Sequence, residues 1–96
     1  MNTNNIIAVP EFCSYYNIPD TFIESLYNIE IIDIVMQENI KCIKKEQINI
    51  IEKMMRLHYQ LDINFEGLDV INNLLNHITD LQNEIIKLHN KIDFYK

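Results

Sequence analysis

Residues 56–68 read Arg56-Leu57-His58-Tyr59-Gln60-Leu61-Asp62-Ile63-Asn64-Phe65-Glu66-Gly67-Leu68, and the chain then continues to Tyr95 without a proline or another glycine. Apolar residues recur there at alternating steps of three and four, at Ile71, Leu74, Ile78, Leu81, Ile85, Leu88, Ile92 and Tyr95. This heptad spacing is typical of a helix that buries one narrow stripe against another helix. A helix over residues 65–95 would be about 46 Å long, too long for a compact domain of this size. The sequence therefore predicts a projecting helix that needs a partner, with a small domain upstream.

The front of the chain predicts two short helices joined by a tight turn. Pro10 suits the first turn of a helix over residues 10–16, and Pro19 suits the start of a second helix. Apolar residues lie three or four apart in both segments, and Asn17-Ile18 forms the turn between them. Two helices connected in this way indicate a helix-turn-helix. Residues 1–8 show no periodicity and are interpreted as a loose tail or an edge strand.

Residues 29–43 are rich in β-branched side chains and predict a hairpin. Its strands are expected over residues 31–36 and 40–43, around Gln37-Glu38-Asn39, where Asn39 tolerates a left-handed conformation. A third helix is expected over residues 45–61, with a wide apolar stripe that includes Leu61 and belongs in the centre of a core.

The third helix is followed at once by a new helix start. Asn64 is a good N-cap, and Ile63 before it is placed to contact Leu68. Gly67 is the only glycine of the chain and weakens the first turn. We expect it to mark a close approach of the third or the second helix. These assignments give one domain over residues 1–96, with the helix-turn-helix, hairpin and third helix in residues 9–63 and the dimerisation helix in residues 64–96.

The net charge of −6 is unevenly distributed. Residues 1–40 contain six acids and no Lys or Arg, whereas residues 41–60 have a local excess of +3. An acidic surface repels phosphate backbones and attracts a basic partner. The expected acidic face consists of Asp20, Glu24, Glu30, Asp33 and Glu38, with Tyr15 or Tyr27 as an aromatic anchor.

Several function classes lack support in the sequence. No run of about 18 apolar residues predicts a membrane span, and the N-terminus does not resemble a signal peptide. Cys13 and Cys42 are isolated, which favours reduced thiols in a cytoplasmic protein. The histidines lack metal-site spacing, and no nucleophile, base and acid occur together. We therefore expect no catalysis, no metal and no cofactor.

The chain resembles the MerR-type winged helix-turn-helix, and more specifically a CbpM-type chaperone modulator. The residues that carry the resemblance are Phe12-Cys13-Ser14-Tyr15-Tyr16-Asn17-Ile18, Phe22-Ile23-Glu24-Ser25-Leu26 and, most specifically, the segment from Arg56 to Gly67. It covers about residues 8–95. One departure is Asn28-Ile29-Glu30-Ile31-Ile32, where MerR-like sequences usually have a Gly-Leu-Ile turn into the wing.

The resemblance implies a protein that binds the J-domain of a DnaJ- or CbpA-like co-chaperone and blocks its stimulation of Hsp70. The alternative is a MerR-like DNA-binding transcriptional regulator. Base readout requires Arg, Lys, Asn or Gln on the recognition helix and cations for the phosphates. The second helix has Asp20, Glu24 and Asn28 and no cation, so nucleic-acid binding is disfavoured. A merely solvated acidic face is the remaining interpretation.

The end of the long helix predicts a homodimer. Beyond about residue 78 no sequence remains to cover the stripe, so the expected dimerisation residues are Ile78, Leu81, Ile85, Leu88, Ile92 and Tyr95. Isoleucine at the first heptad position and leucine at most fourth positions suit a parallel pair. MerR-like proteins instead pair these helices antiparallel, and the orientation stays open.

Overall fold

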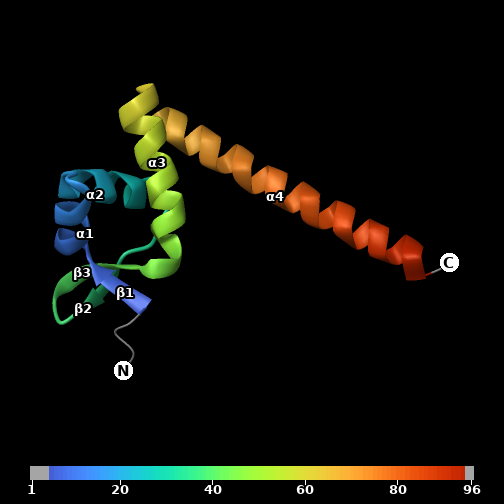
Figure 1. Ribbon diagram of the computed structural model, residues 1–96, viewed down its shortest axis with the longest axis horizontal. Coiled ribbons are helices and arrows are strands. Elements are labelled where there is room, and N and C mark those ends of the chain that lie inside the picture. The colour runs from blue at the N-terminus through green and yellow to red at the C-terminus, as the bar shows by residue number, and fades with distance from the viewer. Residues whose placement is uncertain (1–4, 95–96) are drawn as a thin grey trace.

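The computed structural model describes residues 5–94, and Figure 1 shows a small domain from which one long helix leaves. The predicted class, a mainly helical winged helix-turn-helix with a small hairpin and a long C-terminal helix, is confirmed. A 3-10 turn at Lys45–Gln47 precedes the third helix. The other elements are β1 (Ile6–Ala8), α1 (Val9–Tyr16), α2 (Asp20–Asn28), β2 (Val35–Gln37), β3 (Ile40–Lys44), α3 (Ile48–Leu61) and α4 (Phe65–Phe94).

The helix-turn-helix forms where the prolines and Asn17 predict it. Pro10 lies in the first turn of α1, and Asn17 ends that helix in the left-handed conformation, with φ 57°. The N–H of Ile18 donates to the carbonyl of Cys13 over 3.0 Å, which satisfies a carbonyl that the helix end leaves free. Pro19 then precedes α2 directly.

The end of α2 explains where the hairpin begins. Glu30 adopts a left-handed φ of 64°, and the N–H of Ile31 donates to the carbonyl of Leu26 over 3.0 Å. This arrangement is a Schellman motif, in which glycine is the preferred left-handed residue. Glu30 therefore occupies a position of this motif at which glycine is preferred.

Replacing Glu30 by glycine is expected to raise the free energy of unfolding by about 0.5–1 kcal/mol, because glycine removes the steric cost of the left-handed conformation. Urea unfolding followed by circular dichroism measures the change. Glu11→Gly is the control, because Glu11 lies in the first turn of α1 and glycine costs about 1 kcal/mol in helical conformation. A loss of stability in Glu30→Gly comparable to that of the control would contradict this reading of the turn.

The predicted strand over residues 31–36 is wrong at its start, since β2 covers only Val35–Gln37. The chain is still turning after Glu30, and side-chain bonds satisfy the backbone there. Gln47 accepts from the N–H of Asp33 over 2.8 Å and donates to the carbonyl of Asp33 over 3.1 Å. A glutamine amide thus supplies the hydrogen bonds that a neighbouring strand would otherwise provide.

The wing is a tight hairpin with a two-residue turn. Glu38 and Asn39 have φ of 53° and 65°, as a type I′ turn requires. Met36 pairs with Lys41 across the two strands. On the other side of β3, β1 pairs in antiparallel register, so the sheet order is β1-β3-β2. Of the two alternatives for residues 1–8, the described part shows an edge strand at Ile6–Ala8; residues 1–4 lie outside it.

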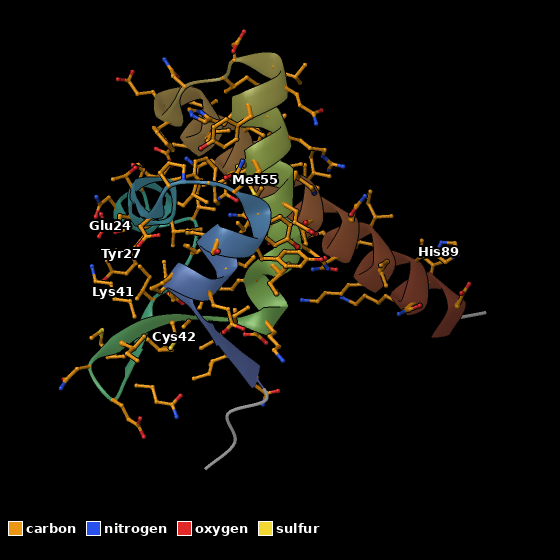
Figure 2. The ribbon with its side chains drawn as sticks, turned by 60° about the vertical axis from the view of Figure 1, so that its left-hand side comes forward. Glu24, Tyr27, Lys41, Cys42, Met55 and His89 are labelled. Atoms are coloured by element: carbon orange, nitrogen blue, oxygen red, sulfur yellow. The ribbon has the colours of Figure 1, made fainter. Side chains whose placement is uncertain are left out.

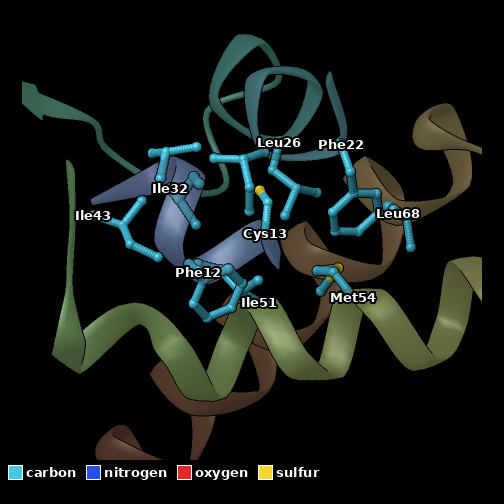
Figure 3. Close-up of a cluster of buried hydrophobic side chains, with 11 residues drawn as sticks. Phe12, Cys13, Phe22, Leu26, Ile32, Ile43, Ile51, Met54 and Leu68 are labelled. Atoms are coloured by element: carbon cyan, nitrogen blue, oxygen red, sulfur yellow. The ribbon is translucent and has the colours of Figure 1, made fainter. Parts of the chain in front are cut away.

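A single hydrophobic core holds the domain together, and Figure 3 shows it between α1, α2 and α3. Residues from every helix contribute fully buried side chains, each worth about 1.5–3 kcal/mol. The largest of them are Phe12, Phe22, Ile23, Leu26, Ile43, Ile51, Met54 and Leu68. Leu61 was predicted to join the stripe of α3, but it lies at the last position of that helix and is 64% exposed.

The joint between α3 and α4 is built from residues 58–67. The predicted N-cap is confirmed, since Asn64 Oδ1 accepts from the N–H of Gly67 over 2.8 Å. His58 Nδ1 lies 2.8 Å from the carbonyl oxygen of Ile63. A carbonyl only accepts, so Nδ1 carries the proton of that bond. Phe22, Tyr59 and Phe65 surround the imidazole, with Phe65 stacked on it at 4.7 Å between ring centroids.

Gly67 does mark a close approach, but the predicted neighbour is wrong. A Cβ at this position would lie 2.7 Å from Ile63 Cγ2 and 3.3 Å from Asn64 Oδ1. The space is taken by the segment just before α4 rather than by α2 or α3. A side chain at residue 67 would therefore require the Ile63 side chain to shift.

Helix α4 projects from the domain as expected. Its 30 residues span about 45 Å. The radius of gyration is 17.1 Å, whereas a compact chain of this length has about 12–13 Å. Only the first turns, through Leu68 and Leu75, pack against the domain core.

Candidate functional site

The outward face of α2 meets the hairpin and carries most of the predicted acidic face. Phe22, Ile23 and Leu26 point into the core. The opposite side therefore presents residues spaced three or four apart: Asp20, Glu24, Tyr27 and Asn28. Figure 2 shows Glu24 and Tyr27 lying above Lys41 of the hairpin, on one side of the domain.

Three adjoining hollows lie along α2, two of them against the hairpin and the third against residues 30–33. The first is lined by Asp20, Glu24, Ile34, Ile40 and Lys41, together with the start of α1. The second shares Glu24, Ile34 and Lys41 with the first and adds Tyr27, Asn28 and Met36. The third shares Tyr27 and Asn28 and ends at Glu30, Ile32 and Asp33. Because neighbouring hollows share residues, they form one surface depression, which we call the α2–wing groove.

The charge of the α2–wing groove is strongly negative. Its lining includes four carboxylates, from Asp20, Glu24, Glu30 and Asp33, and one ammonium, from Lys41. Lys41 Nζ lies 3.1 Å from Glu24 Oε1, and both side chains are about half exposed. An exposed pair of this kind contributes about 0–1 kcal/mol. The lysine thus neutralises one carboxylate weakly, and the groove remains attractive to cations.

The α2–wing groove also has an apolar part that sequence analysis missed. Met36 is 61% exposed and Ile40 48%, and Ile34 lines two of the hollows; these three side chains join the predicted Tyr27, which is 47% exposed. A signal for this part was present in the hairpin: Met36 and Lys41 are cross-strand partners and so share one face of the sheet. Finding it required the true turn, because a register shift of one residue reverses the faces.

Two of the predicted acidic-face residues do not line the α2–wing groove. Glu38 lies in the turn at the tip of the hairpin. Tyr15 is 81% exposed on α1, with its ring edge-on to Tyr16 at 5.0 Å. Asp20, Glu24, Tyr27, Glu30 and Asp33 are brought together. The groove therefore combines four predicted acids with one of the two predicted aromatic anchors.

The second candidate surface is the stripe of α4. Its apolar side chains are between 50% and 64% exposed in the single chain, at Leu74, Ile78, Leu81, Ile85, Leu88 and Ile92. The predicted dimerisation residue Tyr95 lies outside the described residues. Within the described part, the stripe is open to solvent along the length that the sequence assigned to dimerisation.

The reactive side chains of the domain have structural partners. Burial raises the pKa of the Cys13 thiol to about 12, so the thiol is protonated at neutral pH. The hydroxyl of Tyr16 donates to Glu52 over 2.7 Å, and this bond raises the pKa of Tyr16. Within residues 5–94, no His, Cys, Asp or Glu side chains gather into a possible metal site. No helix in that range has the length and apolar character that a membrane crossing requires.

A family model described as MerR HTH family regulatory protein matches residues 7–90, which include the helix-turn-helix, the wing and most of α4. No curated protein matches the chain significantly.

Proposed function

We propose, from the premise that this chain belongs to the MerR HTH family of regulatory proteins, that it is a chaperone modulator. In this proposal it binds the J-domain of a DnaJ- or CbpA-like co-chaperone and inhibits the stimulation of Hsp70 by that J-domain. The family of the chain does not distinguish this role from transcriptional regulation. The proposal therefore depends on the resemblance to CbpM-type modulators and on the chemistry of the α2–wing groove.

The observation that carries the proposal is the charge of the groove. In a DNA-binding helix-turn-helix the second helix enters the major groove, and Lys and Arg neutralise the phosphates around it. Here the corresponding helix α2 has Asp20 and Glu24 on its outward face, and the nearby Lys41 is paired with Glu24. A phosphate backbone would meet four carboxylates in this groove. A protein partner with a basic helix suits it better.

A J-domain offers a basic helix of this kind, as the family resemblance implies. Opposite charges across an interface accelerate encounter and select the partner, whereas buried aromatic and apolar side chains supply most of the affinity. The groove combines both features, since Tyr27, Met36 and Ile40 are exposed between its carboxylates. The same surface can therefore attract the J-domain and hold it.

The modulator is further proposed to be a homodimer joined through α4. Burying an apolar stripe of six residues from each copy would release enough free energy to hold two helices together. No part of the described chain covers this stripe beyond Leu75. An antiparallel pair, as the resemblance implies, would place the two α2–wing grooves at opposite ends of the rod.

Reversing the charge of α2 with Asp20→Lys and Glu24→Lys is expected to weaken binding of a purified J-domain by ten- to a hundredfold. Each lost attraction contributes on the order of 1 kcal/mol. Isothermal titration calorimetry at low salt measures the affinity, and circular dichroism checks that the variant folds. Asp80→Lys with Asp93→Lys on exposed α4 changes the net charge equally and should bind as the unmodified protein does.

A DNA shift assay at about 0.15 M salt, run beside the J-domain titration, separates the two functions, because nonspecific DNA affinity is strongly salt-dependent. Binding of the J-domain without a DNA shift is the expected result. A DNA shift without J-domain binding would replace the proposal by transcriptional regulation. If the α2 variant and the α4 control variant bind the J-domain with equal affinity, the acidic face is not part of the interface.

A further inference from the structure

The α2–wing groove has a definite order of chemical groups along its length. Asp20 lies at one end, beside the start of α1, and Glu30 and Asp33 lie at the other. Tyr27, Ile34 and Met36 lie in the section between them. Helix α2 has nine residues and is about 13 Å long. The groove is therefore long enough for two to three turns of a helix and presents acids at both ends of an apolar middle.

We infer that the α2–wing groove is the docking site for a single basic amphipathic helix of the partner, and that Lys41 is an internal competitor for that helix. The apolar face of the docked helix contacts Tyr27, Ile34 and Met36. One of its cations takes the place of Lys41 Nζ at Glu24, and others face Asp20, Glu30 or Asp33. This inference rests on the proposed function for the identity of the partner and deepens it by assigning the site.

A helix fits this surface better than an extended segment does. An extended peptide would have to add to the outer edge of β2, which is at the border of the sheet and has only three residues. So short an edge offers few backbone hydrogen bonds. A helix in the groove instead uses side-chain contacts, with apolar anchors three or four residues apart.

The role of Lys41 follows from its contact and its exposure. The Lys41–Glu24 pair joins β3 to α2 across the groove at 3.1 Å, with both side chains about half exposed. Such a pair is weak because water screens it. A cation of the partner can therefore replace Lys41 at Glu24. Because the Lys41–Glu24 pair must first be broken, Glu24 contributes less to the binding free energy than an unpaired carboxylate would. Removing the ammonium frees Glu24 and makes the groove more negative by one charge.

The test uses the full-length protein and a purified J-domain, with affinity measured by calorimetry at two salt concentrations. Lys41→Met keeps an apolar stem over the groove and is expected to tighten binding three- to tenfold, with a steeper dependence on salt. Tyr27→Ala is expected to weaken binding at least tenfold. Tyr15→Ala is the matched control, since Tyr15 is exposed on α1 outside the groove, and should change affinity by less than twofold.

The outcomes test the assignment of the groove as the docking site separately from the proposed binding of a J-domain. If the J-domain binds but Tyr27→Ala behaves like Tyr15→Ala, the groove assignment is overturned and the proposed function stands. If Lys41→Met weakens binding, Lys41 is a direct contact and its role as competitor is wrong. If the J-domain does not bind, the proposed function fails. A synthetic Leu- and Lys-containing amphipathic helix is then the second probe, and the groove assignment requires that it bind and that Tyr27→Ala weaken this binding.

Discussion

Ile85→Lys is expected to convert the proposed dimer to a monomer. Ile85 lies in the middle of the α4 stripe and is 64% exposed in the single chain. Each copy of the dimer would lose a buried isoleucine worth about 2–3 kcal/mol, and the effects add across the symmetric pair. The dimer dissociation constant should rise by at least a thousandfold. Light scattering at micromolar concentration should then give a mass near 11.5 kDa instead of twice that value.

Asn83→Lys is the matched control for Ile85→Lys. Asn83 lies two residues away on exposed α4, outside the heptad stripe, and the charge change is the same. It should leave the mass of the dimer unchanged. Thermal unfolding of the domain should be similar in both variants when measured as monomers, because the α4 residues beyond Leu75 do not pack against the core. If Ile85→Lys remains a dimer, the interface does not lie on the apolar stripe of α4.

Phe22→Ala is expected to lower the free energy of unfolding by about 3–5 kcal/mol, as truncation of a buried phenylalanine usually does. Phe22 is 2% exposed and contacts three aromatic rings, with centroid distances of 5.4 Å to His58, 5.3 Å to Tyr59 and 5.7 Å to Phe65. The variant removes a side chain of α2 that touches both α3 and the start of α4. Many small domains have only 5–15 kcal/mol of total stability, so it should be partly unfolded at physiological temperature.

Urea unfolding of Phe22→Leu and Tyr15→Ala gives the scale for this loss. Phe22→Leu keeps most of the buried volume and should cost about 1–1.5 kcal/mol. Tyr15→Ala removes an exposed ring and should cost less than about 0.5 kcal/mol. A similar cost for Phe22→Ala and Tyr15→Ala would mean that the aromatic cluster does not hold the joint together.

The helices were predictable because local chemistry determines their ends. Pro10 and Pro19 lie at helix starts, where a missing N–H costs nothing. Asn17 ends α1 in the left-handed conformation, and Asn64 caps the start of α4 with its side-chain oxygen. The heptad spacing after Ile71 similarly required no knowledge of the rest of the chain. These signals depend on residues within one or two turns of each other, so a sequence displays them directly.

The errors occur where distant or unusual contacts override the local pattern. Residues 31–34 have the β-branched composition of a strand, but the left-handed Glu30 and the clamp from Gln47 hold them in a turn. Leu61 continues the apolar spacing of α3, yet the helix ends there, at the border of the core. For residues 31–34 the composition was read correctly but the start of the strand was wrong; for Leu61 the end of the helix was predicted correctly but the burial of its side chain was wrong.

The acidic part of the candidate site could be predicted from the sequence, but its apolar part could not. The acids of residues 20–33 can be counted in the sequence, and their charge is the property that disfavours DNA. These acids line the same groove as Ile34, Met36 and Ile40 only because the hairpin folds back against α2. No local sequence pattern encodes that contact. The separation of Tyr15 from Tyr27 has the same origin, because α1 and α2 turn different faces to solvent.

The joint at Gly67 gives α4 the properties of a lever. A helix of 30 residues amplifies small rotations, so a change of roughly 10° at the joint would displace its far end by on the order of 8 Å. A larger residue at position 67 would have to displace the Ile63 side chain at this joint. Substitutions at these two positions can thus alter the distance between the two proposed binding surfaces of the proposed dimer while leaving both surfaces chemically intact.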